Sequence, residues 1–127
     1  MIHIPIIGQV SAGTPFDFIP IERWRWIRPL QFTSPGEQVY GMEVVGDSLK
    51  DKNILDGDIL VFVHGQPSRP SDLCIVQTPH GLTAKYVYPR EDGEVLLASA
   101  NALIRDQVWS MSDVKIIGVV KRVERDL

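Results

Sequence analysis

Short apolar runs separated by turn residues recur along the whole chain. The runs are rich in Val, Ile, Leu and aromatic residues, and they end at Gly, Pro, Asp or Asn. Runs of this kind, without a helical period, are typical of β-strands joined by turns. The sequence therefore predicts an all-β fold. The predicted strands cover residues 39–45, 59–63, 73–78, 82–88, 94–99 and 114–123.

The N-terminal part has a different pattern. Residues 3–10 contain a proline and a glycine and are predicted to be extended. They lead into Ser11-Ala12-Gly13-Thr14-Pro15, a run of small residues that we expect to be exposed. We therefore divide the chain into an N-terminal arm or linker, residues 1–15, and a globular domain, residues 16–127.

The segment Trp24-Arg25-Trp26-Ile27-Arg28 alternates apolar and basic residues, which favours a short strand or strand edge. Aromatic and basic side chains together can stack nucleic-acid bases. The chain as a whole carries a net charge of −3, however, and nucleic-acid-binding surfaces are usually basic. We therefore interpret these tryptophans as half-buried packing residues, and we expect no direct DNA binding by this chain.

The composition is that of an ordinary soluble protein, with 127 residues, 44% hydrophobic and 23% charged. One cysteine, Cys74, cannot form an internal disulfide and lies in an apolar run, so we interpret it as a buried thiol in a reducing compartment. No apolar run reaches 18 residues, and the N-terminus lacks the basic start of a signal peptide. We expect a cytoplasmic protein without membrane contact.

One polar turn carries candidate chemistry. Gly46-Asp47-Ser48-Leu49 interrupts two apolar runs, and Gly46 allows a sharp bend with positive φ. Such a bend can expose the Ser48 hydroxyl together with an unpaired backbone N–H, which are a nucleophile and an oxyanion donor for acyl transfer. An ordinary turn between strands is the alternative.

Lys85 lies within the predicted strand 82–88. It either points to solvent, or it faces inward, where desolvation lowers the pKa of its amine and makes it a base. The acidic stretch 51–58 lacks the spacing and final glutamate of a calcium loop, so we predict no metal. The three histidines are interpreted as surface residues. No cofactor is predicted.

The ordered set of motifs resembles the self-cleaving peptidase domain of LexA-type repressors, UmuD-type mutagenesis proteins and lambdoid phage repressors. That family has an Ala-Gly cleavage site, a Gly-x-Ser-Met turn, a strand with a catalytic lysine, and a Gly-containing closing strand. The matching segments here are Ala12-Gly13, Gly46-Asp47-Ser48-Leu49, Thr83-Ala84-Lys85 and Ile117-Gly118-Val119-Val120, with further similarity at 56–61 and Asn101. Leu49 replaces the usual methionine, a volume-conserving change.

The resemblance implies a fold of several small, strongly bent sheets and a Ser-Lys serine peptidase. Ser48 would be the nucleophile, Lys85 the base, and the backbone N–H groups of Ser48 and Asp47 the oxyanion donors. The Ala12–Gly13 bond would be cut once, within the chain. The resemblance also implies a homodimer through the C-terminal strand and stimulation by a RecA–single-stranded DNA filament.

Two identities within this family stay open, because no helix-turn-helix precedes residue 12. The chain is either a short UmuD-like protein or a repressor fragment that begins in the linker. The sequence Ser11-Ala12-Gly13-Thr14-Pro15 resembles a repressor linker more closely. Two other classes of protein share part of this pattern. Gly-Asp-Ser-Leu is also the signature of an esterase family, but that family needs a later histidine and an α/β fold. A non-catalytic β-domain used for dimerisation is the main alternative.

Overall fold

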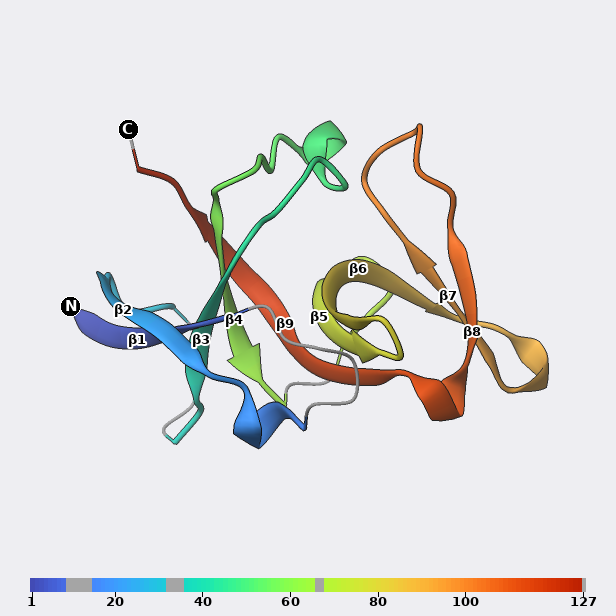
Figure 1. Ribbon diagram of the computed structural model, residues 1–127, viewed down its shortest axis with the longest axis horizontal. Helices are drawn as coiled ribbons and strands as arrows, with labels where there is room; N and C mark the ends of the chain where they lie inside the picture. The colour runs from blue at the N-terminus through green and yellow to red at the C-terminus, as the bar shows by residue number, and fades with distance from the viewer. Residues whose placement is uncertain (9–14, 32–35, 66–67, 127) are drawn as a thin grey trace.

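The computed structural model describes residues 1–8, 15–31, 36–65 and 68–126. Its regular structure consists of nine β-strands and four short 3₁₀ turns (Figure 1). The strands are β1 (Ile2–Ile7), β2 (Ile21–Ile27), β3 (Val39–Glu43), β4 (Ile59–His64), β5 (Leu73–Thr78), β6 (Gly81–Pro89), β7 (Glu94–Ala98), β8 (Gln107–Ser110) and β9 (Lys115–Glu124). The 3₁₀ turns are η1 (Phe16–Phe18), η2 (Lys50–Lys52), η3 (Glu91–Gly93) and η4 (Met111–Asp113).

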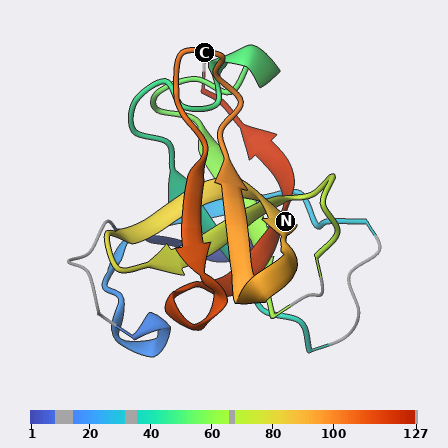
Figure 2. The ribbon, with the colours of Figure 1, turned by 90° about the vertical axis from the view of Figure 1, so that its right-hand side faces the viewer.

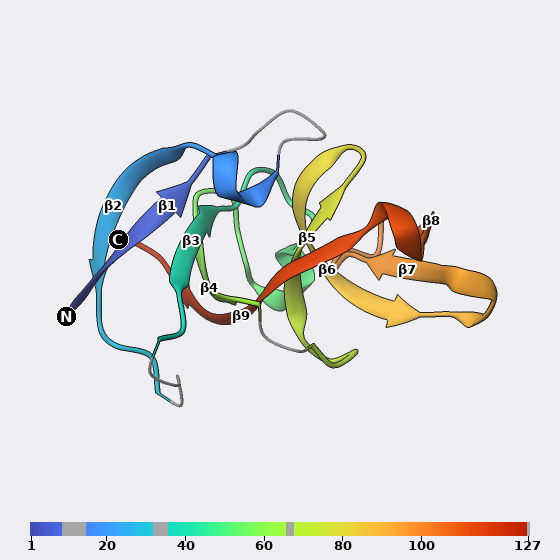
Figure 3. The same cartoon turned by 90° about the horizontal axis from the view of Figure 1, so that it is seen from below.

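The strands form one hydrogen-bonded series in the order β2-β1-β3-β4-β9-β5-β6-β7-β8. All neighbouring pairs are antiparallel except β1 and β3, which are parallel. The sheet is strongly bent, so that β1 to β4 form one half of the molecule and β5 to β8 the other (Figure 3). The β7–β8 hairpin stands at the end of the second half (Figure 2).

Strand β9 joins the two halves. Its N-terminal part pairs with β5, from Lys115 to Val119, and its C-terminal part pairs with β4, from Gly118 to Glu124. Gly118 lies where both pairings overlap, and a Cβ there would be 2.4 Å from the carbonyl oxygen of Val63. Only glycine fits this approach of β9 to β4. In place of several small sheets, the described strands thus form one strongly bent sheet whose two halves are connected through β9.

The core has three clusters of buried side chains. The largest lies between the two halves and includes Met42, Leu49, Leu60, Phe62 and Ile75. Smaller clusters lie under β1 to β4 and under β5 to β7. Side chains of alternate residues in β3 and β4 belong to different clusters. Both faces of these central strands are therefore buried. Burial on two sides explains why residues 59–63 read as a continuous apolar run.

The predicted all-β class is confirmed, and each predicted strand has a counterpart. Strand β8 was not predicted. Strand β1 lies within the expected arm of residues 1–15 and belongs to the sheet, whereas Ala12 and Gly13 lie outside the described residues. Cys74 is fully buried as predicted, and burial raises the pKa of its thiol. In the part of the chain that the structure describes, no helix has the length and apolar character needed to span a bilayer.

Candidate functional site

The turn after β3 presents Ser48 at a partly buried position. Gly46 has φ +90°, as the sequence predicted, and its N–H donates a 2.8 Å hydrogen bond to Oδ1 of Asp56. Among the hydrogen bonds of the described residues, none uses the N–H of Asp47 or Ser48 as donor. Both predicted oxyanion donors therefore remain available to a ligand.

A loop after β7 fixes this turn from the other half of the molecule. The Ala100 N–H donates to the carbonyl oxygen of Ser48 at 2.9 Å, and Nδ2 of Asn101 donates to the carbonyl oxygen of Asp47 at 2.9 Å. Asp51 completes the contact, because its N–H donates to Ala100 O and its carboxylate accepts from the N–H of Ala102. The backbone polar groups of the serine turn that would otherwise bind water thus form hydrogen bonds with the loop after β7.

Lys85 faces inward on β6, which resolves the alternative left open by the sequence. The residue is 7% exposed. Burial lowers the pKa of its amine, and the negative charge of Asp106 opposes this shift only in part. Its Nζ donates a hydrogen bond of 2.5 Å to Oγ of Ser99, the residue that directly precedes Ala100. The lysine is therefore held by the same loop that holds the serine turn.

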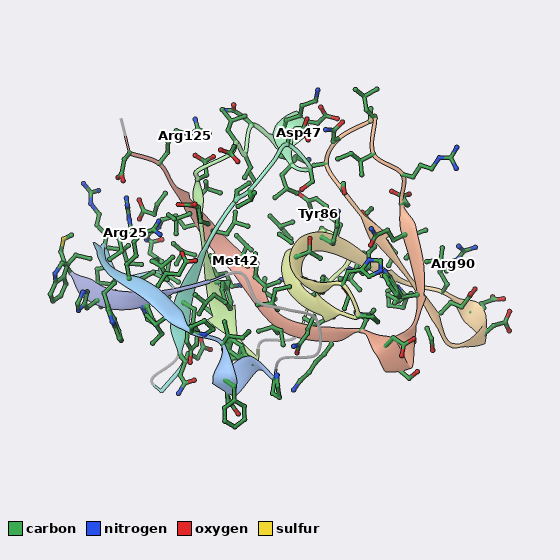
Figure 4. The ribbon with its side chains drawn as sticks, viewed as in Figure 1. Arg25, Met42, Asp47, Tyr86, Arg90 and Arg125 are labelled. Atoms are coloured by element: carbon green, nitrogen blue, oxygen red, sulfur yellow. The ribbon has the colours of Figure 1, made fainter. Side chains whose placement is uncertain are left out.

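A small cavity of about 60 Å³ lies beside Ser48. One wall is the segment from Met42 to Leu49, and the opposite wall is residues 82–84 of β6, immediately before Lys85. Seven of the ten lining residues have apolar side chains, and the volume suits a side chain no larger than a few heavy atoms. Figure 4 shows Asp47 on the turn after β3 and Tyr86 on β6, below the turn in this view.

The Asp56-Gly57-Asp58 turn is hydrogen-bonded to the serine turn and to the end of β3. Besides the bond from Asp56 to Gly46, the Gly57 N–H donates to Val44 O and the Val44 N–H donates to Asp58 O. The Asp58 carboxylate is 2% exposed and accepts two hydrogen bonds from Arg125, at 2.7 Å and 2.8 Å. These bonds lower the pKa of Asp58. The acidic side chains of this stretch are thus occupied by backbone N–H groups and by an arginine.

Among the predicted site residues, Ser48 lines the cavity and Lys85 directly follows the β6 residues that line it. The two are linked through residues 99 and 100. No hydrogen bond between Ser48 and Lys85 occurs in the described part of the chain. Sequence reasoning missed Ser99 and Arg125. The only signal for Ser99 was its place at the end of a predicted strand, and Arg125 gave no signal. The three histidines lie at the surface or partly buried, and His64 packs against Phe16.

The fold and the site define an all-β domain in which a serine on a glycine turn lines a small cavity and a buried lysine lies on the strand that forms another part of its lining. The model of the Peptidase S24-like family matches residues 5–121. The chain belongs to this family, the peptidase family of LexA, UmuD and phage repressors. The resemblance inferred from the motifs is thereby confirmed.

Proposed function

We propose that this chain is a Ser-Lys serine peptidase that cuts its own Ala12–Gly13 bond. The observation that carries the proposal is the state of Lys85. An amine that is nearly excluded from solvent, and whose pKa is lowered by burial, is suited to accept a proton near neutral pH. It lies on the strand that forms one wall of the cavity beside Ser48.

The first chemical step joins Ser48 to the substrate. Oγ of Ser48 attacks the carbonyl carbon of Ala12, and its proton passes to the neutral Nζ of Lys85. The negative charge that develops on the Ala12 oxygen is stabilised by the free N–H groups of Asp47 and Ser48. A cavity of about 60 Å³ accepts the Ala12 methyl group and excludes large side chains.

The second step releases the products. The C–N bond to Gly13 breaks, and the Lys85 ammonium returns its proton to the leaving amine. Water, deprotonated by Lys85, then hydrolyses the ester on Ser48 and regenerates the hydroxyl. For this cycle Lys85 redirects its Nζ from Ser99 toward Ser48. Because the chain is its own substrate, the reaction is a single event and acts as a switch.

The biological setting follows from family membership alone. We propose that the chain serves a DNA-damage response or a phage-type switch, that a RecA–single-stranded DNA filament favours the cleavable conformation, and that the protein acts in the cytoplasm. A homodimer through β9 is part of this proposal. Residues 120–124 of β9 pair with β4 on one side, whereas β5 covers only the N-terminal part of the strand, so an edge remains for a second copy.

A non-catalytic dimerisation domain is the second candidate, and one observation favours it. The hydrogen bond of Lys85 goes to Ser99 and not to Ser48, as it would if the lysine had a purely structural role. The two candidates differ in a simple measurement.

The test is a mass measurement on the purified chain after incubation at alkaline pH. Self-cleavage yields fragments of residues 1–12 and 13–127 in the wild type and none in Ser48→Ala or Lys85→Ala. Ser110→Ala, an exposed serine on β8, serves as the matched control and cleaves normally. An intact wild type under all conditions, or a cut that persists in Ser48→Ala, overturns the proposal.

A further inference from the structure

Strand β2 is one of the two edge strands of the sheet, at the opposite end from β8 (Figure 1). Within the described ranges its only pairing partner is β1, with Pro5 opposite Trp24. Because proline has no N–H, the hydrogen-bonded pairs of this antiparallel ladder are those on either side of the Pro5–Trp24 pair. The backbone N–H and C=O groups of Trp24 and Trp26 consequently point toward the open edge.

The same two tryptophans carry an aromatic surface on one face of β1 and β2. Trp24 is 53% exposed and Trp26 is 60% exposed. The ring of His3 stacks on Trp26, with centroids 4.3 Å apart and planes at 9°, and lies 5.1 Å from Trp24. Packing on His3 covers part of each ring, but the side chains do not enter the core. An open strand edge with exposed aromatic rings is a template for another strand.

The sequence of β2 restricts how two copies could pair. About a two-fold axis, residues opposite each other must lie on the same face of the sheet, which leaves axes at Trp24, Arg25 or Trp26. An axis at Arg25 places the two Arg25 side chains opposite each other, and an axis at Trp24 places Arg23 opposite Arg25. Arg25 already pairs with Asp126 and Arg23 with Glu43, so both axes bring together occupied arginines and give neither a new partner. An axis at Trp26 places Arg25 opposite Ile27 instead.

The Trp26 axis also uses Arg28, whose side chain forms no ion pair within the described ranges. It brings Arg28 opposite Trp24 of the second copy, twice in the dimer. The Arg28 guanidinium forms no ion pair with any residue that the structure describes, although its backbone carbonyl accepts a 2.8 Å hydrogen bond from Arg122 that anchors the end of β2. A guanidinium over a tryptophan face is attractive.

We propose that β2 pairs antiparallel with β2 of a second copy of this chain, about a two-fold axis at Trp26. The contact is isologous and continues the sheet across both copies. It is separate from the β9 edge and does not depend on the peptidase reaction. Because the strand has seven residues, the interface is small and the association is concentration-dependent.

Cysteine substitution tests the axis directly. In a glutathione redox buffer, Trp26→Cys should form a disulfide-linked dimer, because opposed residues of a hydrogen-bonded pair lie about 5.5 Å apart. Trp24→Cys and Arg28→Cys should each stay unlinked alone but cross-link when mixed. The wild type, whose single Cys74 is buried, is the background control.

Sedimentation velocity tests the contact without a covalent bond. Arg28→Glu should lower the association constant on the order of tenfold, since it removes both arginine–tryptophan contacts. Arg105→Glu, at an exposed position outside β2, should leave the association constant unchanged. Linking of Trp24→Cys in place of Trp26→Cys would overturn the proposed axis. A protein that stays monomeric while single-stranded oligonucleotide quenches its tryptophan fluorescence would assign this surface to nucleic acid instead.

Discussion

The side-chain amide of Asn101 donates a 2.9 Å hydrogen bond to the backbone carbonyl of Asp47, a residue 54 positions earlier in the chain. Asn101 is 5% exposed, and its Oδ1 accepts a second bond from the N–H of Leu103. One buried amide thus fixes both the loop after β7 and the turn that presents Ser48. It adds a side-chain contact to the backbone hydrogen bonds between Ala100 and the serine turn.

Replacing Asn101 with alanine should therefore impair both stability and self-cleavage. The carbonyl oxygen of Asp47 and the N–H of Leu103 each lose a part-buried hydrogen bond, and each loss costs about 1 kcal/mol in the free energy of unfolding. Urea denaturation measures this loss. Asn101→Asp keeps the acceptor for Leu103 but loses the donor for Asp47, so it should cleave slowly while retaining more stability. Equal cleavage in the wild type and both variants would contradict a role for the Asp47 contact.

Ser99→Ala should shift the pH dependence of cleavage to lower pH. The Ser99 hydroxyl accepts a hydrogen bond from the Lys85 amine, and this bond favours the charged form. Its removal lowers the pKa of Lys85 further than burial alone does. The cleavage rate, followed by mass spectrometry across a pH series, should level off earlier than in the wild type. Ser99→Thr keeps the hydroxyl and should keep the wild-type profile.

Self-cleavage of the wild type should rise about tenfold per pH unit until the apparent pKa of Lys85 is passed, and then level off. The plateau should begin below about pH 10.4, the ordinary value for lysine, because burial lowers the pKa of this amine. Lys85→Ala should leave no cleavage at any pH. A profile that levels off near about pH 6.5 and survives Lys85→Ala would identify a histidine as the base.

Lys85→Met should stabilise the protein at neutral pH. The folded-state pKa of Lys85 is lowered, so the unfolded chain binds the proton more tightly, and wild-type stability increases as pH rises toward about 10.4. The methionine variant lacks this dependence. Its advantage in thermal denaturation should be largest near pH 7 and should shrink in alkaline buffer. An advantage that stays constant with pH would mean that folding does not lower the pKa of Lys85.

Arg125→Ala should loosen the serine turn, because it removes the partner of the buried Asp58 carboxylate. Hydrogen exchange of the Gly46 N–H, measured by NMR, should accelerate even if the chain does not cleave itself. Arg25→Ala is the matched control, since it breaks the neighbouring Arg25–Asp126 pair, which has no bond to that turn. Equal acceleration in both variants would point to general destabilisation.

The Arg125–Asp58 ion pair predicts that part of the folding stability is lost in acid. The folded-state pKa of Asp58 is lowered, so its contribution is present above about pH 3.9 and is lost as pH falls through the folded-state pKa. Asp58→Asn lacks this component. The stability difference between the two proteins should therefore narrow in acid.

Local features of the site were predictable from sequence, whereas its long-range contacts were not. Gly46 and Ser48 lie in one turn, and the backbone requirement of that turn can be read from a few residues. The face of Lys85 depends on how β6 packs, which a strand of mixed apolar and polar residues does not specify. Ser99 reaches its role only through tertiary pairing across 14 positions.

Two further differences from the sequence-based expectations are strand β8, which was not predicted, and the exposure of Trp24 and Trp26, which were expected to be half-buried. Strand β8 has four residues with one buried face at most, so its sequence carries little alternation. Net charge suggested that Trp24 and Trp26 pack in the protein, but charge says nothing about whether a strand lies at an edge. That property arises only when the order of the sheet is known.

The position of β9 also constrains the order in which the chain can fold during synthesis. Both β4 and β5 need β9 as a neighbour, yet β9 is translated after all the other strands. A nascent chain that still lacks residues 115–124 therefore has two unsatisfied strand edges in its interior, and Gly118 cannot yet bring them together. Closure of the sheet must wait until this segment leaves the ribosome, so folding is dominated by contacts between distant residues and is slow. Until then, the nascent protein is exposed to chaperones and to pairing with other chains.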